Sequence, residues 1–286
     1  MRLTKNMVKE MLYNDYTILY KPMPAEIKNL FPVITVDICS EYFGIHFTTK
    51  HRAKMEGFNS LSTTCKGVKD CKKRIEKAFQ LVIPDFKLDS ASIEDIKQAR
   101  KLLDAYIKEH PESQEVSICG FCFSDRQQDY MTNMRPSLLR NKEILNNGII
   151  HSDWLPIINS LYFRVESFGD FASVNAVTNI MNLVKKNPLV FFGIWTKNPQ
   201  YFHKYFKGDK TLKPANCNIL LSGQFINKIP VIPAKYAYFI DKTFTVFTKV
   251  YAKKNSVCIN CGARACLTCL KCYTKNDITS ICESLK

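Results

Sequence analysis

Short apolar runs and amphipathic stretches alternate along the second half of the chain. Strand-like runs are expected at 162–168, 189–195 and 218–223, with helices between them at 173–186 and 199–206. The first two strand-like runs are almost continuously apolar, which is typical of parallel sheets with helices on both faces. The pattern therefore predicts an α/β fold, either a partial barrel or an open sheet.

The remaining elements follow a less regular pattern. Residues 33–48 contain two β-rich runs, which predict a strand pair. A short strand end is expected at 60–65, a strand at 116–123 and a helix at 136–146. A final strand at 244–251 is expected to lead into a run of cysteines.

One amphipathic helix stands apart from the βα alternation. Residues 89–92 supply N-cap candidates, the helix begins at Ile93, and it should end near His110. Because this helix lies between two pairs of cysteines, residues 72–118 are interpreted as a helical insertion.

Length and composition are compatible with a large packed core. The chain has 286 residues, of which 46% are hydrophobic and 23% charged, enough for one large domain or two small ones. We expect an α/β barrel-like domain over 1–243 and a cysteine-rich segment over 244–286 packed on it. No stretch approaches the ~20 apolar residues that span a membrane, and the first residues have no signal-peptide pattern. We therefore expect a cytoplasmic protein without membrane association.

The positive charge is concentrated in the C-terminal third. From Lys185 to Lys286 there are 17 Lys and Arg against 4 Asp and Glu, which is most of the net charge of +15. A polyanionic partner such as a nucleic acid would therefore contact this third of the chain. A solvated basic face that aids solubility explains the same charge.

The cysteines form two groups and three isolated residues. The chain has 12 cysteines and no export signal, and close Cys-x2-Cys pairs in a reducing compartment favour metal ligation over disulfides. Cys39, Cys217 and Cys282 stand alone and are interpreted as small buried side chains. The first group, split by the insertion, is Cys65, Cys71, Cys119 and Cys122; the second is the run Cys258, Cys261, Cys266, Cys269 and Cys272.

The C-terminal run has one cysteine more than a four-ligand site needs. Cys258 precedes the turn at Asn260–Gly262, so we assign the ligands to the other four, Cys261, Cys266, Cys269 and Cys272. Paired zinc ribbons separate their cysteine pairs by ~15–20 residues, whereas closely set cysteines are commoner around iron–sulfur clusters. The spacing favours a [4Fe–4S] cluster and leaves zinc as the alternative metal.

Polar residues follow the predicted parallel strands, where ligands bind in α/β folds. Asp170 follows the first strand, Thr196 and Lys197 follow the second, and Ser222 with Gly223 ends the third. Asp170 and Thr196 have an alternative role as caps of the next helices. Since Ser173 is the better cap for the helix at 173–186, we favour a functional role for Asp170.

Together, these motifs resemble the "gene product 88" family of phages and bacteria, which is itself similar to radical S-adenosylmethionine (SAM) proteins. The resemblance covers roughly 33–275 and rests on the split cysteine group, the segment Arg135–Asn141, the strand RVESFGD, the strand ending TKN, and the terminal NCG-x3-C-x2-C-x2-CY.

The resemblance implies a partial (βα) barrel of the radical-SAM type with a [4Fe–4S] cluster on the N-terminal cysteines. In such enzymes three cysteines bind the cluster, SAM completes it, and electron transfer releases a 5′-deoxyadenosyl radical. Residues Glu166 to Asp170, with Gly169 allowing close approach, would contact the amino group of SAM, and Phe123 would pack near its adenine. Lys197 would contact an anionic group. The C-terminal cysteines would form an auxiliary cluster, and an electron donor would be a partner.

One departure from that family weakens the assignment of SAM. Radical SAM proteins carry a compact Cys-x3-Cys-x2-Cys, whereas here only Cys119 and Cys122 keep the x2 step. The third ligand must come from Cys65 or Cys71 across 47 residues, 72–118. Closing such a loop costs little, because closure entropy grows slowly with length.

Two functions therefore remain open. The first is a radical-SAM-like iron–sulfur enzyme whose substrate, with nucleic acid as one candidate, the sequence does not identify. The second is a non-catalytic nucleic-acid-binding protein with structural zinc or iron–sulfur sites. In the second, phosphates and bases would contact Lys253, Lys254, Arg264, Lys271, Tyr251 and Tyr273.

Overall fold

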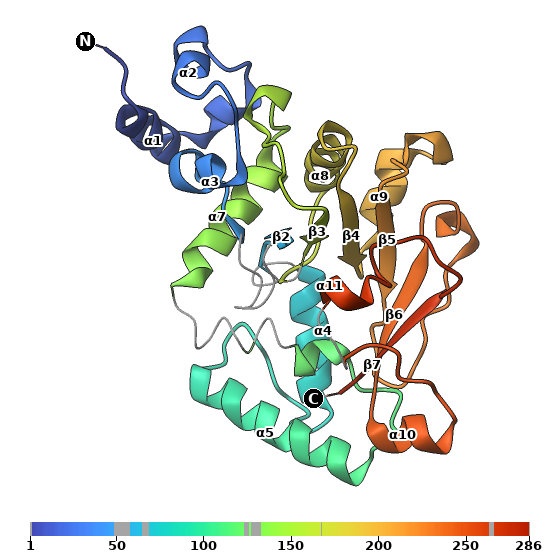
Figure 1. Ribbon diagram of the computed structural model, residues 1–286. Helices are drawn as coiled ribbons and strands as arrows, with labels where there is room; N and C mark the ends of the chain where they lie inside the picture. The colour runs from blue at the N-terminus through green and yellow to red at the C-terminus, as the bar shows by residue number, and fades with distance from the viewer. Residues whose placement is uncertain are drawn as a thin grey trace.

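The protein is built on one seven-stranded sheet whose strands are arranged in chain order (Figure 1). The computed structural model describes residues 2–48, 58–64, 69–122, 126, 133–166, 168–262 and 266–285. β1 pairs antiparallel with β2, and every later neighbour pair is parallel. The strands are β1 Phe47–Thr48, β2 Phe58–Leu61, β3 Tyr162–Val165, β4 Phe191–Thr196, β5 Cys217–Ser222, β6 Lys242–Phe247 and β7 Ser280–Ser284.

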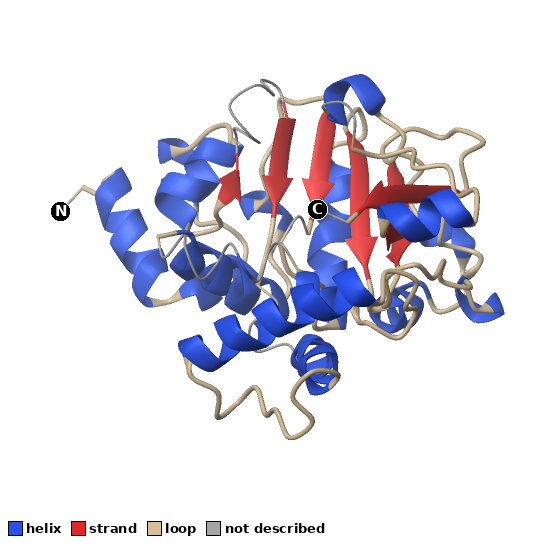
Figure 2. Ribbon diagram, turned by 90° about the horizontal axis from the view of Figure 1, so that it is seen from below, coloured by secondary structure: helices blue, strands red, loops and turns tan. Residues whose placement is uncertain are grey.

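Helices connect the strands, and α1, α2 and α3 precede β1. Figure 2 shows the sheet from below, with its strands in one twisted row and helices around it. The α-helices are α1 Lys5–Asn14, α2 Ala25–Leu30, α3 Val36–Ile38, α4 Lys69–Gln80, α5 Ile93–Glu109, α7 Met134–Asn147, α8 Val174–Lys186, α9 Pro199–Phe206, α10 Lys249–Lys254 and α11 Cys266–Cys269. The shorter helical turns are η1 Tyr16–Tyr20, η2 Cys39–Phe43, η3 Ile118–Phe121, η4 Ser152–Trp154, η5 Lys210–Leu212 and η6 Ala234–Tyr236.

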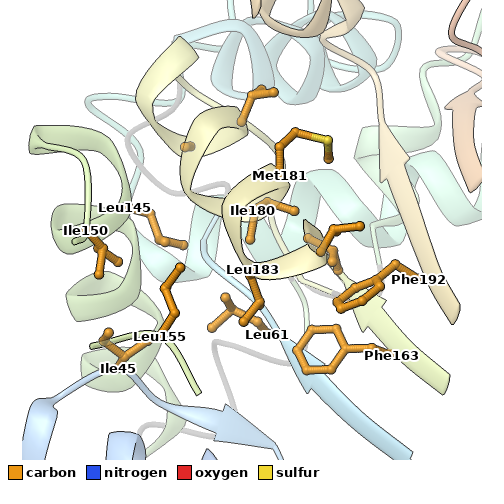
Figure 3. Close-up of a cluster of buried hydrophobic side chains, with 14 of the residues drawn as sticks. Ile45, Leu61, Leu145, Ile150, Leu155, Phe163, Ile180, Met181, Leu183 and Phe192 are labelled. Atoms are coloured by element: carbon orange, nitrogen blue, oxygen red, sulfur yellow. The ribbon is translucent and has the colours of Figure 1, made fainter. Parts of the chain in front are cut away.

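The main hydrophobic core lies between one face of the sheet and the helices. Alternate strand residues such as Phe163, Phe192 and Ile219 enter this core because side chains on a strand point to opposite faces in turn. Buried side chains of α1, α2, α7, α8 and α9 join the same core. Figure 3 shows part of it, with Ile180 and Leu183 of α8 beside Phe163 and Phe192.

Helix α8 illustrates how the sequence specifies these elements. The Ser173 side chain caps the helix by accepting a hydrogen bond from the Ala176 N–H, and Lys185 and Lys186 occupy its last turn, where the helix dipole favours cations. Its apolar residues recur at helical spacing and are buried against the sheet. The helix therefore forms where its cap, its charges and its apolar face agree.

The insertion between β2 and β3 has a hydrophobic core of its own. Phe79 of α4, Leu103 of α5 and Val116 pack together with Cys119 of η3, apart from the main core. Helix α7, which closes the insertion, instead packs against α8. In Figure 1, α4 and α5 lie below the strand ends to which the arrows point.

The opposite face of the central strands is covered by the C-terminal segment. Tyr273 packs on Trp195 and Leu220 of that face, and a Cβ added to Gly193 would approach a Tyr273 ring carbon to 2.7 Å. The buried Asn218 side chain donates hydrogen bonds to the Cys272 and Thr274 carbonyls, at 3.2 and 3.0 Å. On these strands the second face is therefore covered by the cysteine-rich segment, which includes the short helix α11, Cys266–Cys269.

The alternating βα pattern of the second half is confirmed by the structure. The predicted helices at 173–186 and 199–206 correspond to α8 and α9, and the predicted strands correspond to β3, β4 and β5 with ends shifted by a few residues. The predicted helices at 93–110 and 136–146 correspond to α5 and α7. The α/β class with a mostly parallel sheet follows from these elements.

Two strand predictions in the first half are wrong. Half of 33–48 is helical, because Thr35 caps α3 and Val36, Cys39 and Phe43 recur on one buried face, and only Phe47–Thr48 form a strand, β1. Over 116–122 the chain forms a single β-bridge at Ser117 followed by the 3-10 turn η3, which the Ser117 side chain caps, and Phe123 lies outside the described residues.

The C-terminal region also differs from the sequence expectation. The predicted strand 244–251 ends at Phe247, and Thr248 caps α10 before the cysteines begin. Strand β7, which the sequence pattern did not reveal, joins the sheet beside β6. None of the described helices has the length and apolar character that crossing a membrane requires.

Candidate metal and cofactor site

Three cysteines from two distant segments meet at the carboxyl end of the sheet. Cys71 lies in the first turn of α4. Cys119 lies within η3, and Cys122 directly follows it. Burial raises the pKa of Cys119 to about 11, and the neighbouring Cys122 and Cys71 raise it further while Lys197 opposes them. The three thiols thus lie within electrostatic range of one another, although 47 residues separate Cys71 from Cys119.

Backbone pairing fastens η3 to the end of β5. The Ile118 N–H donates to the Gln224 carbonyl at 3.0 Å, and the Ile226 N–H donates to the Val116 carbonyl at 3.1 Å. Gly120 allows η3 to sit between two helices, since an added Cβ would lie 2.5 Å from Leu103 and 2.7 Å from Ala78. Cys119 is therefore held in place by both the sheet and the insertion.

Glu166 follows β3 and carries a fully buried carboxyl group. It accepts hydrogen bonds from the Thr63 N–H at 3.0 Å and from the Thr63 hydroxyl at 2.9 Å. Burial raises the pKa of Glu166 to about 8, and the nearby Asp170 and Cys71 act in the same direction. Its backbone has φ 57°, an uncommon left-handed conformation for a residue other than glycine.

Gly169 makes the close approach between two strand ends possible. Its φ is +95°, and an added Cβ would lie 2.6 Å from the Thr63 hydroxyl and 2.9 Å from a Glu166 carboxylate oxygen. Both the backbone conformation and the available space therefore require glycine here.

Asp170 ties the end of β3 to the end of β4. Its carboxylate accepts hydrogen bonds from the Thr196 hydroxyl, the Lys197 N–H and the Phe171 N–H, each at 2.8 Å. Burial raises the pKa of Asp170, and Lys197 opposes that shift. Neither Asp170 nor Thr196 is the N-cap of the following helix, because Ser173 caps α8 and Asn198 precedes α9. The hydrogen bonds of Asp170 shape the site and leave its oxygens little room for a ligand.

Two cationic side chains face the N-terminal cysteines. Lys197 and Arg74 both act to lower the pKa values of Cys119 and Asp170. Arg74, on α4, donates to the Asn198 side-chain oxygen at 3.0 Å, while its buried Nη1 has no hydrogen-bond partner in the described part of the chain. Arg74 was not among the residues expected at this site from the sequence, although its position one helical turn after Cys71 places both on one face of α4.

Two predicted site residues cannot be placed. Cys65 and Phe123 lie outside the described residues. The other predicted residues of this site lie around the carboxyl ends of β2, β3 and β4. They are Cys71, Cys119, Cys122, Glu166, Gly169, Asp170, Thr196 and Lys197.

The C-terminal cysteines form a second thiol group on the face of the sheet opposite the main core. Burial raises the pKa of Cys261 to about 11 and that of Cys272 to about 12, and both thiols also interact with Cys266 and Cys269. The Cys261 N–H donates to the Cys282 carbonyl at 3.0 Å, which attaches this group to β7. The four thiols, held together by the sheet, are named the C-terminal thiol group below.

Cys258 lies apart from the C-terminal thiol group. It is exposed and interacts electrostatically with the thiol of Cys282 instead. Its position agrees with a ligand set that omits it. Cys39 and Cys217, which also stand alone in the sequence, are buried in the main core.

The thiols are gathered without being arranged as finished coordination sites. Within the described residues, no three His, Cys, Asp or Glu side chains have positions suited to ligating one metal ion. Thiols with raised pKa values are protonated at neutral pH, and metal binding would require their deprotonation. Ligation therefore calls for side-chain rotation as well as proton release.

The basic residues of the C-terminal third are partly engaged within the protein. Lys254 forms a salt bridge with Glu112 at 2.7 Å, and the Lys271 ammonium donates to the Asn260 carbonyl at 2.9 Å. Tyr273 is only 3% exposed, so its ring is not available to stack on a base. Arg264 lies outside the described residues. These contacts weaken the expectation of a phosphate-binding surface around the C-terminal cysteines.

Comparison of the chain with protein-family models, with curated proteins and with solved structures finds no match.

Proposed function

We propose that this chain is a radical-SAM-like iron–sulfur protein with a cluster site at each thiol group. In this proposal the N-terminal site uses Cys71, Cys119 and Cys122, with Cys65 as the alternative or fourth ligand. The C-terminal thiol group holds the second cluster. The observation that carries the proposal is the meeting of three thiols, two buried acids and two cations at the carboxyl ends of the parallel strands.

The topology supports a partial barrel as the finer description of the fold. The parallel strands β2 to β7 follow one another in chain order across the sheet, as in (βα) barrels, and α7, α8 and α9 pack in the main core. A doubly wound fold instead reverses direction and places helices on both faces. A ligand at the carboxyl ends of β2 to β5 would lie where barrel enzymes bind their substrates.

The residues of the N-terminal site fit a bound SAM. Glu166 is a buried carboxyl that forms no salt bridge within the described residues, so an ammonium group beside it would supply a counter-charge. Arg74 Nη1 and the Lys197 ammonium would bind the carboxylate of SAM. When bound, a [4Fe–4S] cluster with SAM supplies one-electron reductive chemistry; the chain's own residues bind the zwitterionic end of the cofactor and hold it in place.

This assignment changes the role of Asp170. Its oxygens already accept three hydrogen bonds, so we assign it to positioning Lys197 and the β3–β4 strand ends. Glu166 is then the acid that contacts the amino group.

Metal analysis of cysteine variants tests the proposal. Protein purified without oxygen should contain iron and sulfide at about four of each per cluster. Cys119→Ala should abolish one cluster and Cys272→Ala the other, each lowering iron by about half. Cys39→Ala and Cys258→Ala are the matched controls, a buried and an exposed cysteine outside both groups, and should retain all of the iron.

A second measurement separates SAM chemistry from a purely structural role. The reduced protein incubated with SAM should release 5′-deoxyadenosine, and Glu166→Gln should weaken SAM binding. Protein that contains zinc alone contradicts the iron–sulfur assignment. Iron without 5′-deoxyadenosine contradicts the radical-SAM assignment while leaving the clusters in place.

A further inference from the structure

Arg164 is a charged side chain on a central strand of the sheet for which the described residues provide no charged partner. It lies on β3, and its guanidinium carbon is 4.5 Å from the ring centroid of Trp195 on β4. Within the described residues it forms no salt bridge, and its buried Nε has no hydrogen-bond acceptor. The residue is half-buried, and leaving its buried N–H without an acceptor is costly, so an anionic acceptor beside it is expected.

The neighbouring Trp195 also has a buried N–H group that lacks a hydrogen-bond acceptor among the described residues. Trp195 is only 8% exposed, and its buried Nε1–H also has no acceptor in the part of the chain that the structure describes. Its ring packs against Tyr273 with centroids 5.7 Å apart. Two N–H donors from adjacent strands therefore lie buried together without an acceptor.

These donors lie beside the C-terminal thiol group. Cys261, Cys266 and Cys272 pack against the small core formed by Trp195, Leu220, Tyr273 and Ile281. Arg164 and Tyr162 alternate with the buried Phe163 on β3, so both point to the face that Tyr273 covers, and Arg164 lies over the Trp195 ring of that core. The guanidinium therefore lies on the same face of the sheet as these cysteines.

Two other described charges near these cysteines are already hydrogen-bonded or oppose metal binding. The Lys242 ammonium donates to the Asn276 side chain and to the Ile278 carbonyl. Glu283 is negative and acts to raise the pKa of Cys261. Among the described residues, Arg164 is therefore the cation best placed to compensate an anionic centre.

We propose that Arg164, which lies over the ring of Trp195, is the counter-charge and hydrogen-bond donor of the metal centre at the C-terminal thiol group. This inference rests on the proposed function, because it requires metal at those cysteines. Four thiolates around Zn²⁺ or a [4Fe–4S]²⁺ core leave a net charge of about −2. Arg164 neutralises part of that charge, and its Nε–H and the Trp195 Nε1–H donate to sulfur.

Replacement of the cation tests this role. Arg164→Met should make the C-terminal metal easier to remove with a chelator by about 10–100-fold, the usual effect of losing an outer hydrogen-bond partner. If the metal is an iron–sulfur cluster, its reduction potential should also fall, because removing a positive charge disfavours the added electron. A tenfold preference for the oxidised form corresponds to about 59 mV for one electron.

Three further variants distinguish charge from packing. Arg164→Lys retains the charge and should keep the potential close to that of the unmodified protein, and Trp195→Phe should lower it by removing one donor while keeping an aromatic ring. Arg140→Met is the matched control, since Arg140 also stacks on an aromatic ring, at 4.8 Å from Tyr16, and has a buried unpartnered Nε. That control should lower stability without changing the metal or its potential.

The outcomes separate this inference from the proposed function. Unchanged metal retention and potential in Arg164→Met, with Cys272→Ala losing its metal, would overturn the role of Arg164 and leave the cluster assignment standing. Full metal retention in Cys272→Ala would overturn both. An equal effect of Arg164→Met and Arg140→Met would reduce Arg164 to a packing residue.

Discussion

At the scale of single residues, the N-terminal site combines a buried acid with a glycine that makes room for it. Glu166 and Thr63 come from neighbouring strand ends, and Gly169 closes over both. The contact is short because glycine has no Cβ and tolerates a positive φ. The acid is thereby kept away from water in a site that also contains Cys71.

The titration of Glu166 predicts a pH-dependent stability. Its pKa rises from 4.5 to about 8 on folding, so the folded chain binds the proton more tightly than the unfolded chain. The stability that this carboxyl contributes is therefore complete below its unfolded pKa of 4.5 and is lost as the pH rises towards about 8. Glu166→Gln has no such titration.

Urea unfolding of both proteins across that pH window measures the effect. The free energy of unfolding of the unmodified protein should fall relative to Glu166→Gln as the pH rises, by at most about 1.4 kcal/mol per pH unit. Parallel pH profiles for the two proteins would show that Glu166 titrates normally.

The requirement for glycine at position 169 can be tested against a second glycine. Gly169→Ala should be destabilised by the left-handed backbone, about 1–2 kcal/mol, and by overpacking against Thr63 and Glu166, about 1–3 kcal/mol more. Gly208 has a similar φ of +83° with no atom within 4 Å of an added Cβ. Gly208→Ala should therefore lose only the backbone contribution, and equal losses in denaturant unfolding would contradict the crowding at 169.

At the scale of elements, the insertion supports the site by packing of its own. Helices α4 and α5 and the turn η3 share a core, and that core contains Cys119. Helix α5 begins with a capping box, in which the Ser92 hydroxyl accepts from the Asp95 N–H and the Asp95 carboxylate accepts from the Ser92 N–H. The start of α5 is thus well defined without contact to the main sheet.

Removal of the α5 cap should destabilise the insertion. Ser92→Ala should lower the free energy of unfolding by about 1 kcal/mol, since it leaves backbone N–H groups of the first turn without an acceptor. Ser90 is also exposed, lies two residues earlier and caps no helix, so Ser90→Ala should change stability by less than about 0.5 kcal/mol. Denaturant unfolding compares the two, and equal losses would mean that the cap contributes nothing to the fold.

At the scale of the whole molecule, one sheet organises both thiol groups. The first group lies beyond the carboxyl ends of the strands, and the second lies on the face opposite the main core. Strand β4 serves both, since Gly193 lies under Tyr273 and Lys197 faces Cys119. These positions are four residues apart, or about 13 Å along an extended strand.

Local patterns were sufficient for much of this architecture. Helices α5, α8 and α9 could be predicted because cap, apolar spacing and terminating residues agree within each segment, and the parallel strands because they are short apolar runs between helices. The grouping of the cysteines and the polar strand ends followed from spacing and from the general geometry of parallel sheets. These features depend on neighbours in the sequence.

Long-range contacts decided the rest. Residues 116–123 have a strand-like composition, yet pairing with the chain after β5 and packing between α4 and α5 turn them into a bridge and a 3-10 turn. The proximity of Arg74 to Cys119, and of Arg164 to the C-terminal thiol group, depends on segments that are far apart in the chain. No local pattern encodes such contacts, because burial and charge pairing depend on which surfaces the complete fold brings together.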